Sequence, residues 1–250
     1  MSNIVTVILR KFQQIKSAGQ KGLALLIDPD NALPKELIKR IELAQRSSVD
    51  FIFLGGSLVD GNGVGEVIDL IRGYSSIPIV LFPGSPLQLN GKADAVLFLS
   101  LISGRNPEYL IGNHVVAAPY LKKMGIEVLP TGYMLVDGGK QTTASYISNS
   151  APLPNDKPTI AKATALAGEM LGMQLIYLDA GSGAQDPVSQ EIIKSVSEEI
   201  TCPLIVGGGI VDEHKLSLAY TSGADVVVVG NAIEKEASLI YKLAEEKLKY

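Results

Sequence analysis

Two stretches near the C-terminus decide the fold: PLIVGGGI at 203–210 and ADVVVVGNAI at 224–233. Each is a short apolar run that ends in glycine and continues into a helical pattern. Glycine lets the backbone approach a ligand closely, and the start of a helix offers N–H groups that have no partner. Two such turns in succession are typical of the phosphate site that follows strands 7 and 8 of a (β/α)8 barrel. They therefore predict this α/β fold, a TIM barrel, with a phosphorylated ligand. The alternative interpretation is that they are ordinary strand-to-helix turns in another α/β protein.

The rest of the chain supports the barrel, because apolar runs alternate with amphipathic stretches almost throughout. We predict eight strands, at 23–27, 50–54, 78–82, 95–99, 126–136, 174–179, 203–206 and 225–229. We predict helices near 4–18, 34–47, 63–73, 106–122, 158–172, 187–199, 212–222 and 232–248.

Two segments depart from this alternation. The segment 83–91, PGSPLQLNG, is too short and too broken by proline and glycine for a full helix, so we expect the third outer helix to be reduced or replaced. The segment 137–157 is rich in Ser, Thr, Gly and Pro and follows the fifth strand. It is interpreted either as a loop or lid over the active-site face or as a plain surface insertion.

Composition narrows the class of protein. The chain has 250 residues, and we expect one domain over 1–250. A net charge of −4 gives no electrostatic footprint for nucleic acid, so we expect no nucleic-acid partner. One cysteine, Cys202, is compatible with a reducing compartment, and no apolar stretch is long enough to span a bilayer. We therefore expect a cytoplasmic protein without stable membrane insertion.

Polar residues at the carboxyl ends of barrel strands are the catalytic candidates. Asp28 ends the first predicted strand, Ser57 follows the second, and Asp179 ends the sixth. These side chains offer oxygen atoms as metal ligands, and no His or Cys cluster accompanies them. One or two carboxylates with substrate phosphates suit Mg²⁺ rather than Zn²⁺. We expect Asp28 to be the anionic ligand and Ser57 to lie one strand away from it.

Six motifs in order, LLIDPD, FLGGSLVDG, LFPGSPLQL, YLDAGSGA, IVGGGI and VVVGNAIE, resemble the geranylgeranylglyceryl phosphate synthases and their bacterial relatives. The resemblance covers nearly the whole chain. It implies a prenyltransferase that joins the 3-hydroxyl of sn-glycerol 1-phosphate to C1 of a polyprenyl diphosphate, geranylgeranyl being favoured. It also implies a barrel whose third helix is replaced, and the irregular segment 83–91 agrees with this.

Carried onto this chain, the resemblance implies Mg²⁺ near Asp28 and Ser57, with Asp179 and Tyr177 as catalytic residues. The substrate-binding residues that it implies are Tyr177, Leu178, Asp179, Ala180, Gly181, Ser182, Gly183, Gly208, Gly209, Gly230 and Asn231. The family more often has Glu where this chain has Asp179, which keeps the carboxylate but shortens its reach by one methylene.

The prenyl tail needs an apolar groove, which a thinned helical ring can offer. We expect some lining residues among Leu99, Leu101, Ile102, Tyr109, Val115, Val116 and Tyr120, most of which could equally pack the barrel. We place Tyr109 at the far end of the groove as a stop. We also expect a homo-oligomer.

Two other function classes stay open on the sequence alone. One is an aldolase or isomerase acting on a sugar phosphate, although a Schiff-base aldolase needs a lysine at a strand end and the apolar runs contain none. The other is a non-catalytic barrel that binds a phosphorylated metabolite. Asp28, Ser57 and Asp179 argue against it, because phosphate binding alone does not need them.

Overall fold

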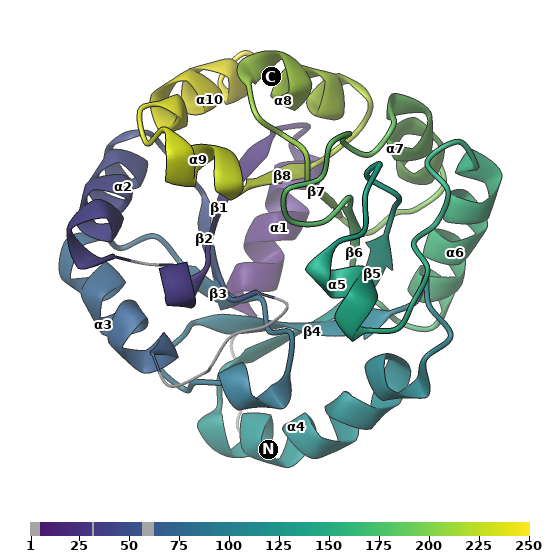
Figure 1. The fold of residues 1–250 in the computed structure, drawn as a ribbon, viewed down its shortest axis with the longest axis horizontal. Coiled ribbons are helices and arrows are strands. Elements are labelled where there is room, and N and C mark those ends of the chain that lie inside the picture. Colours follow the sequence, from purple (N-terminus) through teal and green to yellow (C-terminus); the bar gives the residue numbers. More distant parts are fainter. Residues whose placement is uncertain (1–5, 32, 57–62) are drawn as a thin grey trace.

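Eight parallel strands close into a barrel in the order of the sequence (Figure 1). The computed structural model describes residues 6–31, 33–56 and 63–250. The strands are β1 (Gly22–Ile27), β2 (Phe51–Leu54), β3 (Ile79–Leu81), β4 (Ala95–Leu101), β5 (Glu127–Leu135), β6 (Leu175–Asp179), β7 (Leu204–Gly207) and β8 (Val226–Val229). All eight predicted strands are present, and β8 pairs with β1 to complete the closure. The predicted (β/α)8 fold is confirmed.

A ring of helices surrounds the barrel (Figure 1). It comprises α2 (Pro34–Arg46), α3 (Val64–Tyr74), α4 (Asn113–Met124), α6 (Pro158–Met170), α7 (Gln190–Ser197), α8 (Glu213–Thr221) and α10 (Leu239–Lys247). Short elements complete it: η1 (Pro29–Asn31), η2 (Pro86–Gln88), η3 (Glu108–Gly112), α5 (Thr143–Ile147) and α9 (Asn231–Lys235). The helix predicted over 232–248 is thus broken into α9 and α10. In the part of the chain that the structure describes, no helix has the length and hydropathy of a membrane span.

Strand alternation sorts the apolar side chains into two cores. One cluster lies between the barrel and its helices and contains residues such as Val96, Leu178 and Val227. The other fills the barrel interior and contains residues such as Phe53 and Tyr177. The barrel is therefore a packed core with no passage through it, and access is restricted to its ends.

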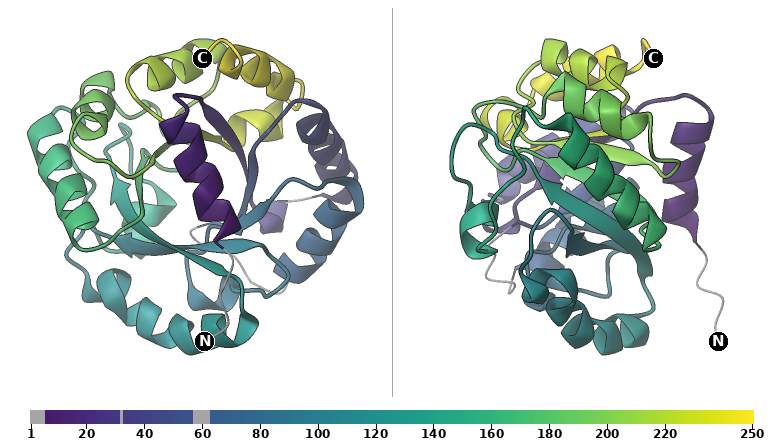
Figure 2. Two further views of the ribbon diagram at one scale, coloured as in Figure 1. Left: turned by 180° about the vertical axis from the view of Figure 1, so that it is seen from behind. Right: turned by 90° about the vertical axis from the view of Figure 1, so that its right-hand side faces the viewer.

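The N-terminal helix α1 (Val7–Ser17) closes the amino end of the barrel, as the left view of Figure 2 shows. Its buried face belongs to the interior core, and the Phe12 ring stacks on Phe51 with centroids 4.2 Å apart. The Glu127 carboxylate at the start of β5 accepts hydrogen bonds from the backbone N–H of Ile8 and of Leu9, each at 2.8 Å. A carboxylate there satisfies unpaired N–H groups and complements the helix dipole. The site must therefore lie at the opposite, carboxyl end.

The connection between β3 and β4 carries only the single turn η2, which confirms that the third outer helix is reduced. Gln88 holds this turn, because its Oε1 accepts from the N–H of Gly84 at 3.1 Å and its Nε2 donates to the carbonyl of Gly56 at 3.1 Å. The other strand-to-strand connections each contain at least one α-helix. On the side of β3, the outer face of β4 is consequently flanked by η2 in place of a full helix.

Candidate active site

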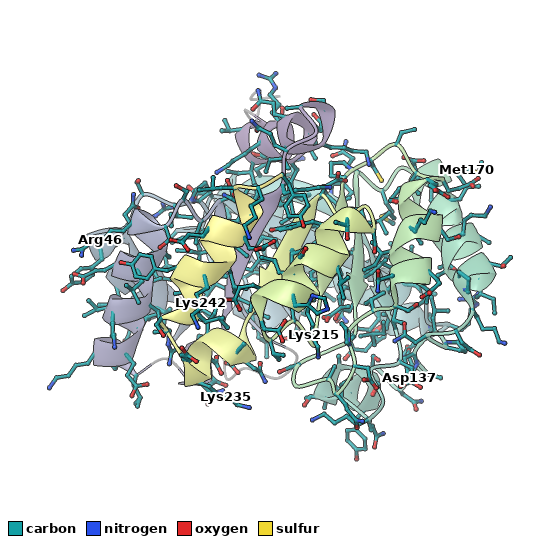
Figure 3. The ribbon with its side chains drawn as sticks, turned by 90° about the horizontal axis from the view of Figure 1, so that it is seen from above. Arg46, Asp137, Met170, Lys215, Lys235 and Lys242 are labelled. Atoms are coloured by element: carbon teal, nitrogen blue, oxygen red, sulfur yellow. The ribbon has the colours of Figure 1, made fainter. Side chains whose placement is uncertain are left out.

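A polar cavity lies at the carboxyl ends of the strands. Its lining includes Asp28, Tyr177, Asp179, Gly181, Ser182, Gly183, Gly208, Gly209, Gly230 and Asn231. These predicted residues come from β1, β6, β7, β8 and the loops after them, and the fold brings them to one place. Figure 3 shows Asp137 and Lys235 on this side of the molecule, away from α1.

The glycine turn after β7 packs directly against the loop after β6. Gly208 and Gly209 have φ angles of +82° and +71°, a left-handed conformation that side chains disfavour. A Cβ on Gly208 would lie 2.6 Å from the backbone nitrogen of Gly181 and 2.8 Å from Oδ1 of Asp179. Only glycine therefore allows the two loops to approach this closely, which explains the sequence signal in physical terms.

Asp179 is buried at the end of β6, with both carboxylate oxygens engaged. Oδ1 accepts from the Gly181 N–H at 2.7 Å, and Oδ2 accepts from the Tyr133 hydroxyl at 2.6 Å. Burial raises the pKa of Asp179, and these two hydrogen bonds oppose that rise. Each oxygen keeps a further lone pair. The Asp179 carboxylate can therefore accept one more hydrogen bond, from a ligand in the cavity.

Tyr177 is fully buried beneath Asp179 in a group of rings. Its ring stacks on Phe82 with centroids 5.4 Å apart and meets Tyr133 edge-on, also at 5.4 Å. Burial raises the pKa of Tyr177 well above its usual value, with the Asp179 charge as the second cause. Its hydroxyl therefore stays protonated, and the ring forms the floor of the cavity.

Asp28 follows β1 and borders the same cavity. Its Oδ1 accepts from the N–H of Asp30 at 3.0 Å, and its Oδ2 accepts from Nδ2 of Asn31 at 2.9 Å. Burial raises the pKa of the Asp28 carboxyl, while the hydrogen bond from the Asp30 N–H lowers it. Burial raises the pKa of Glu234 in α9; Arg40 opposes this rise and the nearby Asp28 charge adds to it. The predicted partner Ser57 lies outside the described residues.

This donor set suits Mg²⁺. Carboxylates line this part of the cavity, while the described residues hold no group of three or more His, Cys, Asp and Glu side chains placed as a metal cage. Magnesium commonly binds one or two carboxylates and completes its shell with water and substrate phosphate. Asp28 is therefore compatible with the predicted role.

Two of the residues that the resemblance implied do not reach the cavity with their side chains. Leu178 and Ala180 belong to the core between barrel and helices, because they alternate with Tyr177 and Asp179 along β6. The N–H of Ala180 donates to the Gly207 carbonyl at 3.0 Å. These two residues support the loop from behind, whereas Ser182 and Asn231 join the loops after β6 and β8 by a 3.1 Å hydrogen bond.

An apolar groove begins at this cavity and runs toward the outer face of β4. The two share Gly56, Phe82, Tyr133 and Ala144. The groove is narrow, with a cavity volume of about 110 Å³, and its lining is mostly apolar. It passes between η2, α4 and α5, where the ring lacks a third helix.

The predicted groove residues divide into two sets. Leu99, Leu101 and Tyr109 line the groove, whereas Ile102 packs in the outer core between barrel and helices. The α4 residues Val115, Val116 and Tyr120 have exposed fractions of 66%, 55% and 59%, so they lie on its outer face. The α4 side chains that line the groove are instead Asn113, His114 and Ala117.

Tyr133, Glu234 and the α5 residues Thr143 and Ala144 were not predicted as site residues. The alternation of β5 gave a usable signal for Tyr133, since it points inward like Leu135. No comparable signal existed for the others, because their positions depend on how loops fold over the barrel. The segment 137–157 is shown to lie at the site, since α5 borders both the cavity and the groove.

Comparison with known proteins agrees with this geometry. The PcrB family model matches residues 17–247. A geranylgeranylglyceryl phosphate synthase of Chitinophaga pinensis is 52% identical and covers 95% of this chain and 94% of its own. One from Pyrococcus horikoshii is 42% identical, covering 92% of this chain and 91% of its own.

Solved structures give the same result. The crystal structure of (S)-3-O-geranylgeranylglyceryl phosphate synthase from Thermoplasma acidophilum with its substrate sn-glycerol 1-phosphate aligns with a TM-score of 0.91 at 32% identity. It covers 97% of this chain and 99% of its own. A tryptophan synthase alpha chain from Legionella pneumophila, at 14% identity and a TM-score of 0.61, shares the fold alone. The chain with this barrel, cavity and groove therefore belongs to the PcrB family.

Proposed function

We propose that the protein is a prenyltransferase that joins sn-glycerol 1-phosphate to a polyprenyl diphosphate, forming a prenyl glyceryl ether phosphate. One observation carries the proposal: a polar cavity bordered by glycine turns and an apolar groove meet at Phe82, Tyr133 and Ala144. A phosphorylated small alcohol suits the first and a hydrocarbon tail suits the second. The names of the relatives support the same reaction.

The reaction exchanges one carbon–oxygen bond for another and transfers one proton. The glycerol C3 oxygen attacks C1 of the prenyl chain, the C1–oxygen bond to the diphosphate breaks, and diphosphate leaves. The hydroxyl proton goes to the Asp179 carboxylate, which the Tyr133 hydroxyl and the Gly181 N–H hold in place. A base with a raised pKa accepts a proton more readily than an ordinary carboxylate does.

Mg²⁺, when bound near Asp28 and Ser57, would neutralise charge on the leaving diphosphate. Asp28 holds its carboxylate at the cavity edge through its bonds to Asp30 and Asn31. The aromatic floor of the cavity and the groove exclude water from the reacting carbon, which protects an allylic cation from hydrolysis.

A C20 tail is our proposal for the length. Tyr109 lines the groove and also packs against the interior core, as Leu99 and Ala144 do. A ring in the path of a longer tail would cause overpacking.

The direct test is to mix the protein with Mg²⁺, labelled sn-glycerol 1-phosphate and prenyl diphosphates of several lengths. Formation of the ether phosphate supports the proposal. Turnover of a sugar phosphate without any prenyl donor would support the isomerase or aldolase alternative. Binding of glycerol phosphate with no turnover of any donor would support a non-catalytic barrel.

The cytoplasmic location and the homo-oligomeric state stay predictions. The outer face of the fourth helical segment exposes Ile111, Val115, Val116 and Tyr120, each more than half exposed, and such a face favours self-association. Light scattering on the native chain and on Val116→Asp measures the assembly, and a wild-type monomer would contradict this prediction.

A further inference from the structure

Two nitrogen donors converge on the space above Gly183, at the edge of the polar cavity. A side chain at Gly183 would meet Nζ of Lys140 at 3.4 Å and Nδ2 of Asn231 at 3.5 Å. Lys140 comes from the connection between β5 and α5, and Asn231 begins α9. Because Gly183 has no Cβ, the space between the two nitrogens is open.

The orientation of the Asn231 amide follows from its hydrogen bond. The Ser182 hydroxyl donates to Oδ1 of Asn231 at 3.1 Å. This bond turns the Nδ2 group, which can only donate, toward Gly183. The lysine ammonium is likewise a donor without an acceptor. Both groups that face this space can therefore donate to an acceptor such as a phosphate oxygen.

The backbone that carries Lys140 is fixed against the loop after β6. The Gly138 carbonyl accepts from the N–H groups of Gln185 and Asp186 at 2.9 Å and 3.1 Å. On its other side, the Thr142 side chain caps α5 by accepting from the Ser145 N–H. The lysine therefore extends from a segment that is held at both ends.

The charge of Lys140 is not used within the described part of the molecule. Lys157 and Lys162 pair with Asp156 and Glu199 at 3.3 Å and 3.2 Å, whereas no described carboxylate forms an ion pair with Lys140. The charged side chains that line the polar cavity are Asp28, Asp179, Glu234, Lys235 and Glu236, so acidic groups predominate. A phosphate dianion entering this cavity needs positive charge beyond that of its lining.

We propose that Lys140 joins Asn231, which the resemblance already assigns to substrate binding, in a two-armed clamp over Gly183 that holds the phosphate of the glycerol phosphate substrate. The identity of this ligand rests on the proposed function, while the anion site itself rests on the two converging donors. Gly183 follows β6 and lies on the loop that packs against the glycine turn after β7, which places the clamp with the phosphate turns. Lys140 is a binding residue in this proposal and takes no part in proton transfer.

The first test removes the charge. Lys140→Met should weaken binding of sn-glycerol 1-phosphate and of inorganic phosphate about tenfold in calorimetry without prenyl donor, since a charge-assisted hydrogen bond is lost. Lys140→Arg should restore most of the affinity, and the KM for the prenyl diphosphate should stay constant. The matched control is Lys157→Met, which removes an equal charge from a lysine already paired with Asp156.

The second test keeps both nitrogens and fills the space between them. Gly183→Ala places a methyl group at the convergence point, at a φ of +68°. Gly19→Ala is its control, because Gly19 has a φ of +65° and nothing within 4 Å of the added carbon. Both variants should lose similar stability, but only Gly183→Ala should lose phosphate affinity.

Wild-type affinity in Lys140→Met or in Gly183→Ala would overturn the clamp. An equal loss in Lys157→Met would also overturn it, because the effect would then be one of net charge. If the wild-type protein binds inorganic phosphate through Lys140 but makes no ether product, the clamp stands and the proposed prenyl transfer fails. The two proposals are thus tested separately.

Discussion

Gly208→Ala tests whether the close packing of the loops after β6 and β7 builds the phosphate site. Alanine at a φ of +82° adopts a left-handed conformation, which costs about 1–2 kcal/mol. Its methyl group would also lie 2.6 Å from the Gly181 nitrogen and 2.7 Å from the Ala180 nitrogen. Both are backbone atoms, so relief requires one loop to move by most of an ångström.

The two costs combine to a loss of about 2–5 kcal/mol in the free energy of unfolding. For a chain of this length each kcal/mol lowers Tm by about 2–4 °C. Gly125→Ala is the matched control, because Gly125 has a φ of +73° and nothing within 4 Å of an added carbon. The control isolates the strain, and the difference between the two variants isolates the contact.

The assay is urea denaturation of both variants together with calorimetry of sn-glycerol 1-phosphate. Because movement of the loop disturbs the Gly181 N–H that binds Asp179, Gly208→Ala should bind at least about tenfold more weakly. Gly125→Ala should bind normally. Equal destabilisation of the two variants, with wild-type affinity in Gly208→Ala, would refute the assignment of this turn to the phosphate.

Four further outcomes are expected. In the wild type, kcat should rise with pH as the Asp179 carboxyl, whose pKa is raised by burial, loses its proton. Asp179→Asn should lower kcat about 100-fold and abolish this rise. A pH–rate profile that keeps the rise excludes a general base at this position. Asp28→Asn should lower kcat/KM by about 100-fold or more and weaken the Mg²⁺ dependence, because the anionic ligand is lost; near-normal activity at limiting Mg²⁺ contradicts it. Tyr109→Ala should extend the accepted tails beyond C20, since each further buried CH₂ adds about 0.8 kcal/mol to the binding free energy of the tail. An unchanged length profile in competition assays would leave this ring a packing role only. Glu127→Gln should lower the free energy of unfolding by about 2–3 kcal/mol, because one of the two charge-assisted hydrogen bonds to α1 is lost. A denaturation midpoint equal to that of the wild type would show that α1 packs on the barrel without this hydrogen bond.

Much of the fold was predictable because its signals are local. Most strands are short runs of apolar residues, and the ends of all eight lie within two residues of the prediction. The reduced third helix was equally visible, since PGSPLQLNG cannot sustain a helical pattern. By contrast, the break between α9 and α10 has no glycine or proline to mark it.

The site was predictable only in part, for the same physical reason. Residues directly after strands, such as Asp28 and Asp179, inherit their positions from the barrel. Lys140 depends on how the connection after β5 folds back, which local sequence does not encode. On α4 the periodicity identified an apolar helix but not its rotation, so Val115 and Val116 were expected in the groove and lie outside it, while His114 lines it.

On the proposed function, the short connection between β3 and β4 would link lipid supply to protein stability. Phe98 on the outer face of β4 is half-buried and lines the groove, on the side where the third helix is reduced. A prenyl chain bound in the groove, as proposed, would add hydrocarbon contacts there, and the ligand would then act as a removable part of the core. Its binding should carry a negative heat-capacity change and, at 100 times Kd, stabilise the native state by about 2.7 kcal/mol. The amount of folded enzyme in a cell would then rise with the concentration of its own lipid donor.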